Sequence, residues 1–429
     1  DGRGFPSPSF GMLDSAAKIE SAGGSFNEYA MESYFSRATL SYKDRYMFTA
    51  TLRTDGSSKF ARENRWGWFP SASFGWNVSK EEFMEGLDVD LKLRASYGRT
   101  GNQESIGYYA YQPKMSGGMN YGLNNGIAIT DFGNLDLTWE KADQFDVGFD
   151  LGLLGGRLNM IFDLYQKNTV DLLYSKEVPA HTGTTSIISN IGSIRNRGVE
   201  FTLNTHFNFG NHFSWLSQFN ISANKNVVMA LADDDGKPLS IGANRALQVG
   251  KEVGAFYIFE MEGIYQYDGE VPDEQYAIGV RAGDVKWKDV DGNGIINDND
   301  RVVTGSSNPD FFGGWNNSFR YKGFQMDIFF TYMYGNDVYA EWMLNTTKLA
   351  HNAPPKAKDV LHRWTGPGST NKYPRAILNG SVNNLKNSMR ILTDVSFIRL
   401  HSLTFSYHFR NELISRIGIE VFRVFFQSS

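Results

Sequence analysis

The chain has 429 residues and a formal net charge of −5, with no Cys, few Pro (12) and many Gly (44), Tyr (21) and Phe (32). The mild charge gives no electrostatic case for nucleic-acid binding, and the absence of Cys excludes disulfides, thiol catalysis and thiolate metal sites. No run of about 18 apolar residues is present, which excludes a membrane-spanning helix but not a membrane barrel, whose alternating strands give a weak hydropathy signal. The composition therefore predicts a protein of strands and turns rich in aromatic residues.

The first part of the chain predicts three strands after a loop over residues 1–31. Residues 34–42 and 46–53 alternate between apolar and polar, and a tight turn at Lys43–Arg45 separates them. A polar loop over 55–65 precedes the clearest strand. In it one row is apolar and the other mostly small: Trp66, Trp68, Pro70, Ala72, Phe74, Trp76 and Val78 against Gly67, Phe69, Ser71, Ser73, Gly75 and Asn77. Tryptophans at both ends of an apolar row are typical of an outer-membrane strand between two aromatic girdles.

Further strands follow in the middle of the chain, separated by loops of very different length. We expect strands over 91–97, 139–151, 158–164, 199–207 and 213–225, and one helical turn within 79–90. The longest excursion, 226–309, contains a β-like segment at 256–267. Beyond the next hairpin we expect helices over 337–349 and 357–364, a strand from about 391 to 409, and another beginning at 421.

The hairpin over 310–334 shows the pattern of the whole chain most plainly. A two-residue reversal at Lys322–Gly323 leads into a strand with an apolar row and a mixed row: Phe324, Met326, Ile328, Phe330, Tyr332 and Tyr334 against Gln325, Asp327, Phe329, Thr331 and Met333. An alternation with a period of two, in which the two rows differ in polarity, indicates a strand that lies between two different solvents. One alternative is a soluble sandwich strand, but the pattern recurs along the chain at lengths suited to a membrane.

The connections between the predicted strands alternate between short and long. Those near residues 44, 84, 155, 211, 322 and 413 are short, and those near 60, 118, 180, 268 and 363 are mostly long. Alternation places all short connections at one end of a sheet, as in a transmembrane β-barrel with periplasmic turns and extracellular loops. A soluble sandwich has no reason to sort its loops in this way. We count about twelve barrel strands by the period-two rule.

Twelve short segments, in order along the whole chain, resemble the SusC/RagA family of TonB-dependent outer-membrane transporters. They are Tyr42–Tyr46, Asp55–Phe60, Arg65–Ser71, Leu93–Gly98, Thr100–Gln103, Leu137–Lys141, Asn190–Ser193, Gly198–Glu200, Gly283–Trp287, Asp289–Gly294, Asn308–Asp310 and Tyr334–Tyr339. The resemblance implies an all-β, antiparallel transmembrane β-barrel of the 22-stranded, plugged class. We expect residues 1–429 to be a single, partial barrel region. Asp1-Gly2-Arg3 does not begin a signal peptide. We expect the N-terminal extension, the TonB box, the plug, the first strands and the last strands of the family to lie outside residues 1–429.

The resemblance also implies a function. Members of the family import oligosaccharides or peptides across the outer membrane of Gram-negative, Bacteroidetes-like bacteria, capped by a SusD-like surface lipoprotein and driven by TonB–ExbB–ExbD. The expected surroundings are therefore outer-membrane lipid, a glycan or peptide substrate and that lipoprotein, with no nucleic acid. The runner-up interpretation from another class is a surface-exposed, calcium-stabilised β-rich binding or adhesion protein.

One motif predicts a metal site on its own chemistry. Asp289, Asp291, Asn293, Gly294, Ile295, Asn297 and Asp300 match positions 1, 3, 5, 6, 7, 9 and 12 of a calcium loop. Hard oxygen ligands at odd spacing wrap the cation, Gly permits the sharp turn, and Ile295 lends its carbonyl. The loop departs from the pattern at Asp300, where Glu is usual. A structural Ca²⁺ ion and a metal-free Asp/Asn/Gly turn both fit, whereas Asp233–Asp235 predicts only a solvated loop.

Sequence signals for catalysis are absent. The seven His lie apart, with no His-Glu-x-x-His motif and no nucleophile elbow. We therefore interpret His206 and His401, inside strands, as lumen or girdle residues and not as ligands. Asp146, Asp163 and Asp327 alternate with apolar residues, which predicts lumen-facing positions and not a glycosidase pair. A secreted carbohydrate-active enzyme, a third possibility, would lack a catalytic constellation.

A group of tyrosines in one long connection is the candidate substrate-binding set. Tyr108, Tyr109, Tyr111 and Tyr121 lie close together in sequence, on a loop that we expect to be extracellular. Their rings either stack on sugars or pack on peptide, or else they serve loop packing and partner contact.

Overall fold

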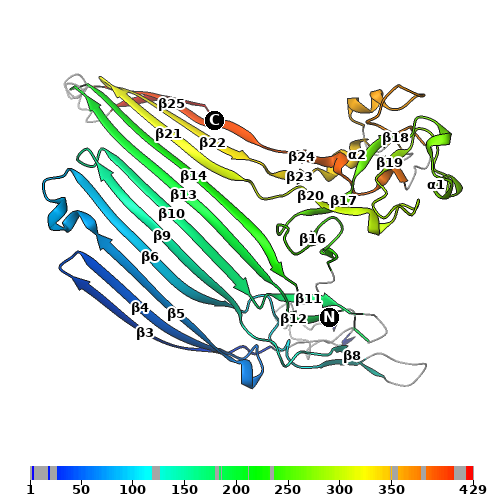
Figure 1. Cartoon of the computed structure of the whole chain (residues 1–429), viewed down its shortest axis with the longest axis horizontal. Helices are drawn as coiled ribbons and strands as arrows, with labels where there is room; N and C mark the ends of the chain where they lie inside the picture. Colours follow the sequence, from blue (N-terminus) through cyan, green and yellow to red (C-terminus); the bar gives the residue numbers. More distant parts are fainter. Residues whose placement is uncertain are drawn as a thin grey trace.

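The structure is a computed structural model. It describes residues 2–3, 18–19, 27–117, 126–178, 183–184, 186–210, 212–231, 236–347, 349, 356–377, 383–409 and 422–428. One antiparallel sheet of twelve strands dominates the described part (Figure 1). Its strands are β3 (Met31–Tyr42), β4 (Tyr46–Ser57), β5 (Trp66–Asn77), β6 (Val89–Asn102), β9 (Glu140–Leu153), β10 (Leu158–Val170), β13 (Ser193–Phe209), β14 (Phe213–Ala230), β21 (Phe311–Tyr321), β22 (Phe324–Tyr334), β25 (Phe397–His408) and β26 (Arg423–Ser428).

These twelve strands pair in sequence order, each with its predecessor and successor in the sheet. Strands β3 and β26 lie at the two edges, so the sheet is open in this chain. The predicted number of strands, their antiparallel pairing and their succession are therefore confirmed. Among the described residues, no helix has the length and apolar character needed to cross a membrane.

The connections between the described strands are sorted by length as predicted, and the short turn expected near residue 413 lies outside the described residues. The short ones, between β3 and β4, β5 and β6, β9 and β10, β13 and β14, and β21 and β22, gather at one end of the sheet, on the left in Figure 1. The turn at Lys322–Gly323 has positive φ at both residues (46° and 94°), the backbone of a type I′ hairpin turn, whose twist matches that of the paired strands. The long connections lie at the opposite end.

Opposite faces of the sheet differ in polarity. Val147, Leu164 and Val199 are direct cross-strand neighbours on β9, β10 and β13, and we call the face that carries them the outer face. Asp163 and Glu200, another neighbouring pair, lie on the opposite, inner face. The outer face is apolar although other parts of the described chain do not cover it: Leu164 is 42% exposed. An apolar face of this extent requires another phase or a partner to cover it.

Strand β5 follows the predicted split between its two rows. Phe74 pairs with Ala95, which pairs with Val147, so the even-numbered row belongs to the outer face. Trp68 of that row is 59% exposed, whereas Phe69 of the other row is buried. The alternation of polarity in the sequence is therefore an alternation between faces.

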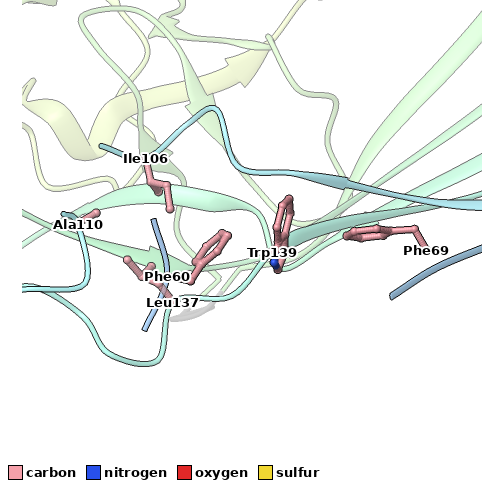
Figure 2. Packing of buried hydrophobic residues seen from close by; sticks show 6 residues of the cluster. All are labelled: Phe60, Phe69, Ile106, Ala110, Leu137 and Trp139. Carbon is pink, nitrogen blue, oxygen red and sulfur yellow. The ribbon is translucent and has the colours of Figure 1, made fainter. Parts of the chain in front are cut away.

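The buried hydrophobic clusters gather among the long connections, and Phe69 of β5 joins one of them from the sheet. Phe60, Phe69, Leu137 and Trp139 pack with Ile106 and Ala110 at the long-loop end of β4 to β9 (Figure 2). The Trp139 ring meets Phe60 at 5.2 Å and the edge of Phe69 at 5.5 Å between ring centroids. Its Nε1 donates to the backbone oxygen of Arg65 at 2.9 Å, so the aromatic cluster is tied to the loop between β4 and β5.

A second assembly, which we call the cap, consists of the described residues of 236–310 and 335–396. It is the group of short elements beyond the ends of β21 and β22, at the upper right of Figure 1. Its paired strands are β15 (Leu239–Ser240) with β16 (Ala246–Leu247), β17 (Phe256–Phe259) with β20 (Arg301–Thr304), β18 (Met261–Ile264) with β19 (Val285–Trp287), and β23 (Asp337–Tyr339) with β24 (Leu392–Asp394). Its helices are α1 (Asp273–Ala277) and α2 (Glu341–Thr347), with 3₁₀ turns η6 (Asp268–Glu270), η7 (Asp298–Asp300), η8 (Lys358–His362), η9 (Asn383–Leu385) and η10 (Met389–Ile391).

Hydrogen bonds and the ion pair of Asp284 with Arg375 join the two excursions that make up the cap. The carboxylate of Asp284 is fully buried and accepts two hydrogen bonds from Arg375, from Nε to Oδ1 and from Nη2 to Oδ2, both at 2.9 Å. Asn384 donates its Nδ2 to the same carboxylate at 2.9 Å, and its Oδ1 accepts the backbone N–H of Val285 at 2.8 Å. Trp287 donates its Nε1 to the backbone oxygen of Asn383 at 2.8 Å. The two excursions thus form one folded unit.

Some expectations about the connections are wrong. The segment 337–349 is not helical from its start, because residues 337–339 form strand β23 and α2 begins only at Glu341. The backbone N–H of Asp337 donates to the oxygen of Ser306, so tertiary pairing overrides the local helical pattern. The expected helix over 357–364 is only the 3₁₀ turn η8. Sequence reasoning missed the hairpins β7 (Lys114–Gly117) with β8 (Ile127–Asp131) and β11 (Leu173–Glu177) with β12 (Ser186–Asn190).

The remaining short elements connect the strands of the sheet. The helical turn expected within 79–90 is a pair of 3₁₀ turns, η3 (Val78–Lys80) and η4 (Glu82–Met84), and η2 (Arg62–Asn64) lies between β4 and β5. In the stretch expected to be loop, β1 (Gly2–Arg3) and β2 (Lys18–Ile19) form a two-stranded pair.

Candidate functional site

The predicted calcium loop is a tight acidic turn in the cap, organised around one carboxylate. Asp289 Oδ1 accepts the backbone N–H groups of Gly292 at 2.7 Å and Asn293 at 3.2 Å, and its Oδ2 accepts that of Gly294 at 2.7 Å. Gly294 has a φ of +79°, which glycine adopts without steric cost. The donated N–H groups, that of Gly294 first, stabilise the carboxylate and lower the pKa of Asp289.

Three of the predicted ligands converge. One oxygen from each of Asp289, Asp291 and Asp300 lies within 4.8 Å of the others. Asp300 is fully buried, and its two oxygens accept the backbone N–H groups of Val290 and Asn297, both at 2.8 Å. Three carboxylates at this spacing repel one another, and a divalent cation would convert that repulsion into coordination.

The other three predicted ligands hold the loop together. Asn293 accepts the backbone N–H of Ile295 at 2.7 Å and donates to Asp291 Oδ2 at 3.0 Å. Asn297 accepts the N–H of Asn299 at 2.9 Å and donates to the Ile295 carbonyl at 3.4 Å. The amide and carbonyl oxygens therefore lie in the same turn as the carboxylates and belong to the oxygen class that Ca²⁺ prefers.

Three of the predicted tyrosines, Tyr108, Tyr109 and Tyr111, lie in the connection between β6 and β7, and Tyr121 lies outside the described residues. Tyr109 accepts the backbone N–H of Glu28 at 2.8 Å, and Tyr111 accepts from its neighbour Gln112 at 2.8 Å. Tyr108 is 43% exposed. The Tyr109 hydroxyl is thus hydrogen-bonded to the segment before β3 and the Tyr111 hydroxyl to its own loop, whereas the ring of Tyr108 is left open.

Sequence reasoning missed the partners of Tyr108. Tyr29 lies 5.8 Å from it between ring centroids, and the buried Lys59 places its Nζ 5.5 Å from the Tyr29 centroid and 5.6 Å from that of Tyr108. The same ammonium donates to the backbone oxygen of Gln103 at 3.2 Å. Two rings sharing one buried cation form a fixed aromatic corner. No local signal reveals it, because its members come from three distant segments.

A pocket of about 500 Å³ opens beside this corner. Tyr29 and Gln103 line it together with Arg53, Asp55 and Trp139. Arg53 donates its Nε to both oxygens of Asp55 at 2.8 Å. The Oε1 of Gln103 is buried and has no hydrogen-bond partner in the described part of the chain. Aromatic walls with a few convergent polar groups are typical of a small-ligand pocket.

The predicted lumen carboxylates lie on the inner face, as expected. Arg94 Nη2 lies 2.9 Å from Asp163 Oδ1 and 3.0 Å from Asp150 Oδ1, so an arginine stands between these acids. Asp146 pairs across strands with Tyr165, and Asp327 with Ser318. This arrangement is an ion-paired polar wall.

Neither strand histidine lies in a metal cluster among the described residues. His206 on β13 places its Nε2 3.3 Å from the hydroxyl of Ser214. His401 on β25 meets the Phe329 ring edge-on at 5.2 Å between centroids. Both rings contact neighbouring strands, and their interpretation as lumen or girdle residues stays a prediction.

Comparison with known proteins places this geometry in a family. Residues 2–385 match the family described as TonB dependent receptor-like, beta-barrel. TonB-dependent receptor P3 of Formosa agariphila is 33% identical over 433 residues, which cover 97% of this chain and 42% of the relative. TonB-dependent receptor SusC of Bacteroides thetaiotaomicron is 29% identical over 442 residues, covering 96% of this chain and 41% of SusC.

Among solved structures, the RagAB peptide transporter matches with a TM-score of 0.79 and 25% identity, over 98% of this chain and 46% of that chain. The chain thus spans less than half the length of the relatives that it matches. The resemblance drawn from the twelve short segments is confirmed, as is the expected fold, a partial barrel of this family.

Proposed function

The chain belongs to the TonB-dependent receptor-like β-barrel family, and from this premise we propose that it forms part of the wall of an outer-membrane active importer. The observation that carries the proposal is the twelve-stranded sheet with an uncovered apolar outer face and a charged inner face. In a membrane barrel the first faces lipid and the second faces the lumen. The sorted connections then become periplasmic turns and extracellular loops.

Labelling of single introduced cysteines in intact cells tests this placement, and the chain has no Cys of its own to interfere. A cysteine at Asn297, in the cap, should react with an impermeant maleimide, whereas one at Gly156, in the turn between β9 and β10, should react only after lysis. Reaction at Gly156 and protection at Asn297 in intact cells would contradict the placement. Detergent dependence and heat-modifiable migration test the barrel itself.

The proposed cargo is an oligosaccharide or a peptide, bound first near the pocket beside Tyr29 and Gln103. Of the relatives, RagAB is a peptide transporter. The open ring of Tyr108 and the unpartnered Oε1 of Gln103 supply a stacking surface and a hydrogen-bond acceptor, which suit sugars and peptide bonds alike. We propose that a SusD-like surface lipoprotein covers the long-loop end and that TonB–ExbB–ExbD drives release inward.

Uptake by cells with and without the receptor distinguishes the two cargo classes. A fluorescent oligopeptide mixture and a fluorescent oligosaccharide mixture are compared, each with and without a proton uncoupler. Import of either class that needs both the receptor and the proton gradient supports the proposal. The variant Gln103→Leu should raise the half-saturating concentration about tenfold, the cost of one lost hydrogen bond to cargo. Equal uptake without the receptor would refute it.

We further propose that the acidic turn over 289–300 binds a structural Ca²⁺ ion. The converging oxygens of Asp289, Asp291 and Asp300 support this assignment, with Asn293, Ile295 and Asn297 as the other predicted ligands. An extracellular site of this kind has a dissociation constant of about 0.1–1 mM. Its role would be to hold rigid a part of the cap that meets cargo or lipoprotein.

Protease sensitivity between Gly283 and Gly305 tests the ion. Chelation, or the double change Asp289→Ala with Asp291→Ala, should speed cleavage there and leave the barrel intact. The matched control is Asp298→Ala, which removes an exposed carboxylate of the same loop that pairs with Arg301 at 3.0 Å. If cleavage is the same with calcium, with chelator and in the double variant, the turn is metal-free.

A further inference from the structure

At the long-loop end of the outer face, the apolar surface gives way abruptly to basic side chains. Val147, Leu164, Val199 and Ala223 form one row across β9, β10, β13 and β14. The next row toward the loops, two residues along each strand, is Phe145, Gln166, Arg197 and Lys225. Because side chains alternate between faces, both rows lie on the outer face.

Two positive charges stand directly opposite each other in this second row. Arg197 and Lys225 are cross-strand partners, and both are exposed. Like charges in this relation destabilise a sheet unless an anion compensates them. Arg195 follows on the same face of β13, two residues closer to the loops. Arg197 donates its Nε to the neutral amide oxygen of Gln166 at 2.6 Å.

Two carboxylates near this cluster make hydrogen bonds to other residues. Asp143, on the same face, is held by Arg99 at 2.7 Å through Nε and 2.9 Å through Nη2. Glu252 accepts the hydroxyl of Ser306 at 2.5 Å. Within the described ranges, no carboxylate lies within ion-pair distance of Arg195, Arg197 or Lys225. The cluster therefore lacks an ion-pair partner among the residues that the structure describes.

A pocket of about 510 Å³ joins the two rows. Phe145, Val147, Leu164 and Val199 line its apolar part, and Arg197 and Lys225 line its basic part. Glu252 and Asp310 also line the pocket. Its apolar part is continuous with the surface that faces lipid in the proposed membrane placement.

We propose that this pocket binds a phosphorylated lipid of the outer leaflet, with its phosphate on Arg197 and Lys225 and its acyl chain along Val147, Leu164 and Val199. The inference rests on the proposed membrane placement. Charge complementarity selects an anion, and the adjoining apolar row selects an anion with a hydrocarbon tail. A diffusible anion or an acidic protein would use the basic row alone.

Lipid retention by the detergent-purified protein tests the site. Mixed micelles containing either dioleoyl phosphatidic acid or dioleoyl phosphatidylcholine are equilibrated with the protein, and bound lipid is counted by native mass spectrometry. The variant Arg197→Gln with Lys225→Gln should bind phosphatidic acid about 25-fold more weakly, about fivefold for each charge removed at a membrane surface. Lys167→Gln is the matched control, because Lys167 lies at the same height on the inner face.

The proposal predicts that wild type and the Lys167 variant retain phosphatidic acid over phosphatidylcholine. Equal retention of the two lipids, or equal retention by the double variant and the control, would overturn it. Displacement of phosphatidic acid by inorganic phosphate at equimolar concentration would show a diffusible-anion site and would also overturn it. Failure of the membrane placement is a separate result: every variant would then be soluble without detergent and show no heat-modifiable migration.

Discussion

Arg375 joins the two halves of the cap, and replacing it by methionine measures its contribution to the stability of the cap. Its guanidinium makes two 2.9 Å hydrogen bonds to Asp284, which is 0% exposed. In Arg375→Met the carboxylate keeps the backbone N–H of Arg281 and the amide of Asn384, both at 2.9 Å. It loses the one cation with which it forms an ion pair in the described part of the chain.

The expected cost follows from the burial of the remaining charge. Breaking a buried ion pair by removing one partner costs about 3–5 kcal/mol. Arg375 is itself 31% exposed at its side chain, and the two remaining hydrogen bonds stay in place, so we expect about 3 kcal/mol. At about 1.4 kcal/mol for each factor of ten, the open cap becomes about 150-fold more populated.

Limited proteolysis of the cap measures this population when opening is fast relative to cleavage. Cleavage between residues 256 and 304 should accelerate by about two orders of magnitude in Arg375→Met, while heat-modifiable migration of the barrel stays unchanged. Lys288→Met is the control, since it breaks a half-exposed pair with Glu260 at 2.9 Å that contributes less than about 1 kcal/mol. Cleavage of the Arg375 variant within fivefold of this control would refute the reasoning.

Three further predictions concern the sheet and the cap. Ala72→Lys should cost about 2–4 kcal/mol in urea unfolding from lipid vesicles, because it places a charge on the lipid face, whereas Ser71→Lys should be mild; equal costs would contradict the orientation. Burial raises the pKa of Tyr339 to about 12, so the neutral phenol stabilises the cap fully below pH 10 and this contribution is lost as the pH rises toward 12. In Tyr339→Phe the absorbance titration of the tyrosines should lose the step near pH 12. Gly101→Ala should cost about 1–3 kcal/mol by overpacking, because its Cβ would lie 2.2 Å from the Phe69 ring; Phe69→Leu should restore part of the stability, and additive losses in the double variant would exclude this contact as the cause.

The sheet could be predicted because its signals are local. The alternation in Trp66–Val78 follows from which face each side chain takes, and that face repeats every two residues whatever the distant partner is. The turn at Lys322–Gly323 could be predicted from two residues alone. The calcium-type spacing of 289–300 also brought three of its acids together within one turn.

The cap and the pocket could not be predicted, because their contacts join distant segments. Asp284 and Arg375 are 91 residues apart, and no local sequence pattern around either residue predicts that they pair. Tyr29 and Tyr108 meet in the same way. Asp337–Tyr339 has a helical local pattern yet forms a strand, since residues 392–394 offer it a ladder. The period-two alternation predicts the strands, but it does not predict how the long connections fold.

The division of the cap between two excursions has a consequence for how such a chain diversifies. The hairpin β21–β22 lies between the two halves in sequence, so any exchange of gene segments that replaces only one half separates Asp284 from Arg375. An exchange that spans both halves together with the hairpin transfers a complete unit with its own core. The two halves are therefore expected to be inherited jointly, and new forms of the cap should arise by replacement of the whole segment more readily than by splicing within it.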